Sequence, residues 1–171
     1  MSQEQYYLGI AKQVSERGTC FRRKIGAIIV RGDQIISTGY VGAPRKTKDC
    51  FEHGFCLRNK LNIPPGQRYE LCRSVHAEQN AIINAARAGV SVLGGTIYIW
   101  ACNPDGSIVR AFPCFICKKM IINAGLEWVI CSIEDNKVRR FTVEQFKSEW
   151  RQNDIVDDKD QYGVSTKPDP A

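Results

Sequence analysis

Hydrophobic residues in the first forty positions change from helical to strand spacing. Four of them recur on one side of a helix: Tyr7, Ile10, Ala11 and Val14. This spacing predicts a helix over residues 6–17. Two short apolar runs, 24–31 and 34–40, predict strands, and the Gly32-Asp33 turn between them predicts a hairpin.

The second half of the chain alternates helical and strand patterns. Apolar periodicity predicts helices over 76–88, 114–124 and 142–150, and short apolar runs predict strands over 96–102 and 127–131. Strands that alternate with helices in this way favour a layered α/β architecture.

Residues 41–74 interrupt both patterns. They hold Pro44, Pro64-Pro65, many charges and three cysteines. A loop of this length is uncommon unless it is functional or held by additional bonds, which the cysteines offer. Beyond about residue 154 the chain is acidic and contains prolines. We therefore expect one domain over 1–153 and a flexible tail over 154–171.

The composition narrows the class of protein. Hydrophobic residues make up 43% and charged residues 25%, which excludes a wholly disordered chain, a collagen or a simple coiled coil. No apolar run approaches the ~18 residues of a membrane span. The first residues carry neither the basic nor the apolar part of a secretory signal, so we expect a cytoplasmic protein.

Charge is unevenly distributed. Residues 1–75 hold 13 Lys and Arg against 6 Asp and Glu. A basic first half suits an anionic ligand such as a nucleotide or a nucleic acid, and it is equally compatible with a solvated surface.

The cysteines and two histidines carry the strongest chemical signal. Eight cysteines without a secretory signal indicate metal binding or catalysis rather than disulfides. His76-Ala77-Glu78 is followed by Pro113-Cys114-Phe115-Ile116-Cys117, each at the predicted start of a helix. His76, Cys114 and Cys117 supply three zinc ligands and leave a fourth position for water, as in catalytic sites. The helix dipole favours the thiolates, and Glu78 is placed to carry protons.

Each half of this pattern also has another interpretation. A Cys-x-x-Cys pair occurs in redox sites and in structural zinc sites, and a His-x-Glu triplet occurs by chance. Together and in this order, the two halves are the signature of zinc nucleobase deaminases, so we favour a catalytic zinc site.

Four segments carry a resemblance to a known family: Ile25–Val30, Gly39–Pro44, His76–Ile82 and Ile121–Gly125. Over about residues 7–131 the chain resembles the cytidine and deoxycytidylate deaminase superfamily, and is most like its bacterial and phage deoxycytidylate (dCMP) deaminases. The resemblance implies a three-layer α/β/α fold with a central five-stranded mixed sheet.

The resemblance also implies an activity and roles for residues. The activity is zinc-dependent hydrolytic deamination of dCMP to dUMP and ammonia, which supplies dUMP for thymidylate synthesis. Glu78 would protonate N3 of the ring and then the leaving ammonia. The backbone N–H of Ala77 would hold the pyrimidine carbonyl, and the carbonyl of Phe112 would accept from the amino group. Family members form homo-oligomers, and we expect one here.

The chain departs from the family pattern at two places. Val41 stands where the family has Asn in a Gly-Tyr-Asn-Gly segment, which lies near the nucleotide and, in some members, near a triphosphate effector. Valine cannot replace the amide hydrogen bonds, so sugar contacts and control by dCTP or dTTP stay open. Residues 103–112 are inserted before Pro113, and we expect a surface hairpin, with a lid over the pocket as the alternative.

A second, structural zinc is a further implication of the resemblance. Cys20, Cys50, Cys56 and Cys72 fall where phage and bacterial dCMP deaminases place such ligands. A four-cysteine zinc is closed and stabilises the fold directly. His53 competes for a place, because Cys50-x-x-His53-x-x-Cys56 is also ligand spacing. Free thiols are the remaining alternative.

A nucleoside monophosphate needs cations or backbone donors for its phosphate. The candidates are Arg23, Lys24, Arg45, Lys46, Lys48 and Arg73. Lys24 and Arg45 border segments that flank the pocket in the family, so we assign the phosphate to them. Taken one at a time, each of these cations is more often a solvated surface charge.

Two other functions compete with dCMP deamination. A tRNA adenosine deaminase shares both motifs but usually lacks a cysteine-rich insert. A non-catalytic zinc module that binds nucleic acid has no need of a proton carrier such as Glu78. The sequence therefore favours a dCMP deaminase, with a nucleotide rather than a nucleic acid or a membrane as its partner.

Overall fold

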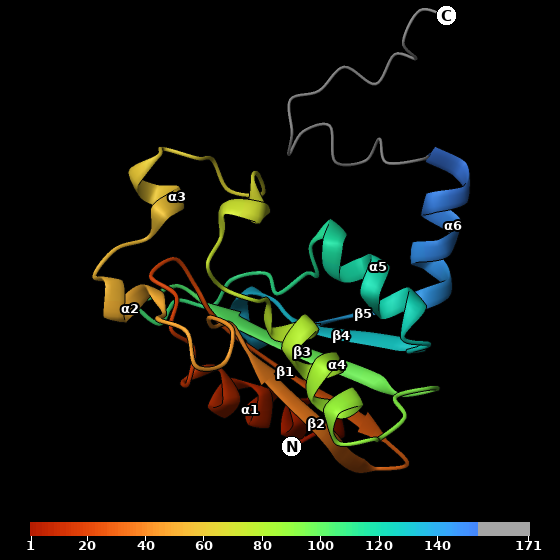
Figure 1. Ribbon diagram of the computed structural model, residues 1–171. Helices are drawn as coiled ribbons and strands as arrows, with labels where there is room; N and C mark the ends of the chain where they lie inside the picture. Colours follow the sequence, from red (N-terminus) through yellow and green to blue (C-terminus); the bar gives the residue numbers. More distant parts are fainter. Residues whose placement is uncertain (154–171) are drawn as a thin grey trace, which may run out of the picture.

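The computed structural model describes residues 1–153, except the side chains of Asn136 and of residues 150–153 (Figure 1). The tail expected over 154–171 lies outside the described residues. None of the helices in the described part of the chain has the length and apolar character needed to span a bilayer.

Five strands form one mixed sheet in the order β2-β1-β3-β4-β5. They are β1 (Lys24–Arg31), β2 (Gln34–Tyr40), β3 (Thr96–Cys102), β4 (Trp128–Ser132) and β5 (Val138–Thr142). The β3–β4 pair is parallel, and the other three neighbouring pairs are antiparallel. The expected five-stranded mixed sheet is confirmed.

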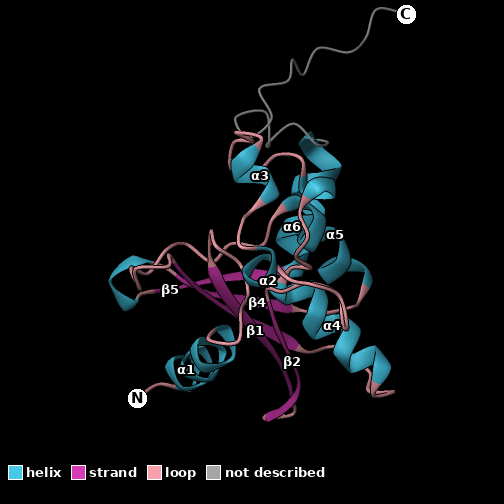
Figure 2. Cartoon of the chain, turned by 60° about the vertical axis from the view of Figure 1, so that its left-hand side comes forward, coloured by secondary structure: helices cyan, strands magenta, loops and turns pink. Residues whose placement is uncertain are grey.

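Helices cover both faces of the sheet. Helix α1 (Gln3–Ser15) packs on one face, and α4 (Ala77–Arg87), α5 (Phe115–Asn123) and α6 (Val143–Asn153) lie on the other. Figure 2 shows α1 on the opposite side of the sheet from these three helices. The three-layer arrangement expected from the resemblance is therefore present.

Alternating side chains of the central strands fill two cores. Ile28, Tyr98 and Trp100 face α1, whereas Ile29, Ile97 and Ile99 face α4, α5 and α6. Because successive residues of a strand point to opposite faces, a strand covered on both sides is apolar throughout, which is what the sequence shows.

Glycine allows α4 to lie directly on the hairpin. A Cβ at Gly39 of β2 would lie 2.3 Å from both the carbonyl oxygen of Ala77 and the amide nitrogen of Ala81. Asn80 donates from Nδ2 to the carbonyl of Tyr40 over 2.8 Å. These contacts fix the N-terminus of α4, and hence His76, relative to the end of β2.

The insert over 41–74 contains short helices that the sequence did not predict. They are α2 (Cys50–His53), α3 (Leu57–Lys60) and the 3₁₀ turn η1 (Tyr69–Leu71). Asp49 and Glu52 form a capping box around the first of them. A four-residue helix has too few positions to show a periodicity, so the pattern alone could not reveal it.

Candidate metal centre and active-site cavity

Two helix N-termini meet at one point of the fold. His76 is the N-cap residue of α4, Cys114 is the N-cap residue of α5, and Cys117 lies in the first turn of α5. His76 Nδ1 lies 3.3 Å from Cys114 Sγ and 3.4 Å from Cys117 Sγ. In the part of the chain with described side chains, no other three His, Cys, Asp or Glu residues bring ligand atoms within 4.8 Å of one another.

The three side chains fit zinc. With Zn–N near 2.1 Å and Zn–S near 2.3 Å, tetrahedral geometry gives an N···S separation of about 3.6 Å. The two observed separations, 3.3 and 3.4 Å, are close to this value. One imidazole and two sulfurs are the donor set of catalytic zinc sites with an open fourth position.

The protein environment favours a thiolate at Cys114. A hydrogen bond from the Cys117 thiol, together with His76, holds the pKa of Cys114 well below its usual range. The same interaction and burial raise the pKa of Cys117. Burial of the His76 ring lowers its pKa, but the hydrogen bond and charge of Cys114 outweigh this and raise the pKa overall. These shifts favour a thiolate at Cys114 beside the His76 ring.

Glu78 is a buried carboxyl group next to these ligands. Its residue is 5% exposed and lies in the first turn of α4. Burial raises its pKa, while the charge of His76 lowers it, and the net shift is upward. A raised pKa brings a carboxyl group closer to neutral pH, which suits general acid–base catalysis.

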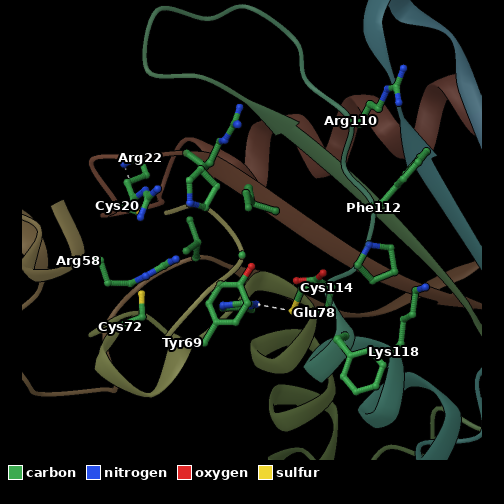
Figure 3. Close-up of a pocket in the computed structure, with 18 of the residues that line it drawn as sticks. Cys20, Arg22, Arg58, Tyr69, Cys72, Glu78, Arg110, Phe112, Cys114 and Lys118 are labelled. Carbon is green, nitrogen blue, oxygen red and sulfur yellow. Dashed lines mark hydrogen bonds between the residues drawn. The ribbon is translucent and has the colours of Figure 1, made fainter. Parts of the chain in front are cut away.

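A cavity of about 740 Å³ opens above this group. Figure 3 shows Glu78 and Cys114 at one side of it and residues of the insert at the other. The cations that line it are Arg22, Arg23, Arg58, Arg73, Arg110, Lys118 and Arg139. The only carboxylates in the described lining are Glu78 and Glu149, so the cavity suits an anionic ligand.

Two residues expected to contact substrate through their backbones lie beside the centre. Ala77 is fully buried as the first residue of α4, between His76 and Glu78. Phe112 lines the cavity directly before Pro113, and its ring packs edge-on against Phe141.

The segment 103–112 forms a hairpin, and its second arm is part of the cavity wall. Gly106 N–H donates to the carbonyl of Asn103, and a bridge pairs Cys102 with Ile108, so the segment folds back as a hairpin. Its return arm brings Arg110 and Phe112 to the cavity.

The structure does not bring Lys24 and Arg45, the assigned phosphate ligands, to the cavity. Lys24 Nζ pairs with Glu16 at 2.6 Å, and Arg45 donates to Asn84 Oδ1 at 2.6 Å. Lys46 and Lys48 are exposed and absent from the lining.

Two of the phosphate candidates, Arg23 and Arg73, do line the cavity. Sequence reasoning missed the other cations: Arg22, Arg58, Arg110, Lys118 and Arg139. Val41, which replaces the asparagine of the family's Gly-Tyr-Asn-Gly segment, is buried and forms part of the cavity wall.

The four cysteines proposed for a second zinc all line the same cavity. Burial raises the pKa of Cys20, and the charges of Cys72 and Cys56 add to the shift, which indicates their proximity. Their sulfurs do not form a group within 4.8 Å in the described structure. His53 packs against Phe55 and does not line the cavity. Cys20, Cys50, Cys56 and Cys72 thus share the cavity lining, and His53 lies outside it.

Comparisons with known proteins agree with this geometry. A family model, the cytidine and deoxycytidylate deaminase zinc-binding region, matches residues 1–133. A deoxycytidylate deaminase of Mycobacterium phage D29 is 32% identical over 132 residues, covering 74% of this chain and 91% of that protein. The Schizosaccharomyces pombe deoxycytidylate deaminase is 31% identical over 129 residues, 75% of this chain but 36% of that protein. The chain thus spans about a third of the length of this yeast relative.

A solved structure extends the similarity to three dimensions. The dCMP deaminase of cyanophage S-TIM5, in complex with dCMP and dUMP, is 28% identical, with a TM-score of 0.53. The match covers 74% of this chain and 79% of that one. With the family model matching residues 1–133 and the zinc-binding motifs meeting in space, the chain belongs to the cytidine and deoxycytidylate deaminase zinc-binding family.

Proposed function

We propose that this protein is a zinc-dependent hydrolase that converts dCMP to dUMP and ammonia and so supplies dUMP for thymidylate synthesis. The observation that carries the proposal is the buried Glu78 carboxyl group beside the His76, Cys114 and Cys117 ligand set, at the wall of a basic cavity. The phage relatives named for dCMP deamination support this substrate, and one of them is matched over 91% of its length.

His76, Cys114 and Cys117 would hold the zinc. Zinc in such a site supplies a water molecule that is activated near neutral pH. Glu78 would hold the proton taken from this water and deliver it to N3 of the cytosine ring. It would then take the proton of the new hydroxyl group at C4 and deliver it to the amino group, which leaves as ammonia while the C4 carbonyl forms. The backbone N–H of Ala77 and the carbonyl of Phe112 orient the ring. Burial of Glu78 excludes bulk water from the proton path.

The proposal includes a structural zinc on Cys20, Cys50, Cys56 and Cys72. Their shared place in the cavity lining supports it, because a closed four-cysteine site would hold the insert against the sheet. This restraint matters for the reaction, since the insert supplies one wall of the cavity.

Three finer expectations belong to the same proposal. The enzyme assembles as a homo-oligomer and acts in the cytoplasm. The third concerns control by the effectors dCTP and dTTP. Apolar Val41 forms part of the cavity wall where the family has an asparagine amide, so adding each nucleotide to the assay tests whether this control is retained.

The test is ammonia release from dCMP, CMP, dCTP and deoxycytidine in parallel, with a tRNA stem-loop as a fifth substrate. The proposal expects dCMP to be the best substrate. Release from the tRNA alone, or from none of the five in zinc-loaded protein, would overturn it.

A further inference from the structure

Arg58 is a buried cation with an incomplete set of partners. The residue is 5% exposed, and its Nε is buried without a hydrogen-bond partner. Its Nη2 donates to the carbonyl of Pro64 over 3.2 Å. In the described part of the chain no carboxylate lies within 4.0 Å of it.

A buried guanidinium without an anionic partner destabilises the folded protein. A guanidinium carries five N–H donors and stays charged at all physiological pH values. Burying this charge without an anion is unfavourable, and an unpaired buried donor adds to the cost. A bound anion that accepts from the free donors would offset both.

The position of Arg58 connects it to the metal centre. Its guanidinium stacks over the ring of Tyr69, 4.8 Å from the ring centroid. The Tyr69 ring in turn meets the His76 ring edge-on, with 4.9 Å between centroids. One aromatic ring therefore separates the guanidinium from a zinc ligand. In Figure 3 the Arg58 side chain extends from the insert toward Tyr69 and the cavity.

Three other arginines near this wall have hydrogen-bond partners for their side chains. Arg22 and Arg73 donate to main-chain carbonyls of Ile63 and Lys48, and Arg23 donates to Asn103 Oδ1. None of these three has a buried nitrogen without a partner, whereas Arg58 does.

On the opposite side, Lys118 and Arg110 pair with carboxylates. Lys118 Nζ lies 3.5 Å from Glu149, and Arg110 Nε lies 3.4 Å from Glu134. Arg139, the remaining cation of the lining, is exposed and lies over the ring of Phe141. Arg58 is therefore the cation of the described lining that is buried with a nitrogen lacking a hydrogen-bond partner.

We propose that Arg58 binds the 5′-phosphate of the substrate and so makes the enzyme select a nucleoside monophosphate over a nucleoside. A guanidinium matches the geometry of a phosphate with two parallel hydrogen bonds, and Tyr69 holds its plane. This inference rests on the proposed function, because it presumes that the pyrimidine ring lies at the metal centre.

The experiment compares the affinities of zinc-loaded protein for dUMP and for deoxyuridine by calorimetry, in wild type, Arg58→Met and Arg58→Lys. Arg68→Met is the matched control, since this arginine of the same insert is exposed and pairs with Glu70. The expected result for Arg58→Met is a fall of about 30-fold in the dUMP-to-deoxyuridine affinity ratio, with an intermediate fall for Arg58→Lys and none for the control.

An unchanged ratio in Arg58→Met overturns the assignment, as does an equal loss for both ligands, which indicates a structural role. If Arg58→Met does not fold, Arg58→Lys decides in the same way. Failure of the proposed function appears separately: wild type would then bind dUMP no better than deoxyuridine and would release no ammonia from dCMP.

Discussion

His76 Nδ1 and Cys114 Sγ lie 3.3 Å apart although the two residues are 38 positions apart in the chain. Helix α4 leads into β3, and α5 connects β3 to its parallel neighbour β4. This order of elements brings the N-termini of α4 and α5 together, so the metal centre is a consequence of the topology. The positive ends of two helix dipoles meet there, which favours a bound thiolate.

We expect Cys114→Ser and His76→Ala each to lose the zinc at this centre. A hydroxyl is a poor zinc ligand, and two remaining ligands do not complete a catalytic site. Metal analysis after dialysis should show one zinc fewer per chain, with deamination at the background rate. A variant that keeps full zinc content would show that the ligands are different ones.

The second cysteine group predicts a second zinc. Wild type should contain about two zinc ions per chain, and Cys50→Ser should contain about one, because the other site is unaffected. We also expect a lower melting temperature, since a closed site stabilises the fold. Cys102→Ala, which alters a cysteine buried in the α1-side core, is the control and should keep both ions. A wild type with a single zinc would contradict the structural site.

Close packing of α4 on β2 predicts a large effect at Gly39. In Gly39→Ala, the new Cβ would meet backbone atoms of α4 at 2.3 Å, so the helix must move. We expect a loss of about 1–3 kcal/mol in the free energy of unfolding. The displaced helix also carries His76, so zinc affinity should fall.

Gly9 provides the matched comparison for this substitution. It lies within α1, and nothing lies within 4 Å of a Cβ there. Gly9→Ala should therefore stabilise the protein by about 0.5–1 kcal/mol, with both variants measured by urea denaturation. If Gly39→Ala proved as harmless as Gly9→Ala, the described helix–strand distance would be wrong.

The Tyr7–Asp33 contact predicts a pH-dependent stability. Tyr7 Oη donates to Asp33 Oδ1 over 2.7 Å. This hydrogen bond, followed by burial, raises the pKa of Tyr7 to about 12 from 10.0. Because the neutral phenol is favoured in the folded state, its contribution is present below pH ~10 and is lost as the pH rises toward 12.

Urea denaturation of wild type and Tyr7→Phe tests this relation. At neutral pH we expect wild type to be more stable by about 1 kcal/mol. The difference should shrink between pH 10 and pH 12. A difference that is constant over this range would show that the phenol titrates in the same way in both states.

Much of the fold was predictable because its signals are local. The sheet strands over 24–31, 34–40 and 96–102 agree with the structure, and so do the helices that begin after His76 and Cys114. Strand β5 was missed. It lies at the sheet edge and carries exposed Arg139 and Arg140, so it lacks the apolar alternation of a half-buried strand.

The site was predictable where one motif fixes both residue and position, as for His76, Glu78 and the Cys-x-x-Cys pair. It was not predictable where the tertiary structure decides. Lys24 and Arg45 looked well placed in the sequence, yet each faces a partner outside the cavity. Arg58 showed no signal, because burial of an arginine depends on the path of the whole insert.

The most direct test of the account is the rate of dUMP formation from dCMP by wild type and Glu78→Gln at equal zinc content. The exposed Glu127→Gln serves as control. We predict that wild type and the control convert dCMP at the same rate, whereas Glu78→Gln keeps its zinc and is slower by about 10²- to 10⁴-fold. Equal rates for Glu78→Gln and wild type, or no dUMP from zinc-loaded wild type, would contradict the account.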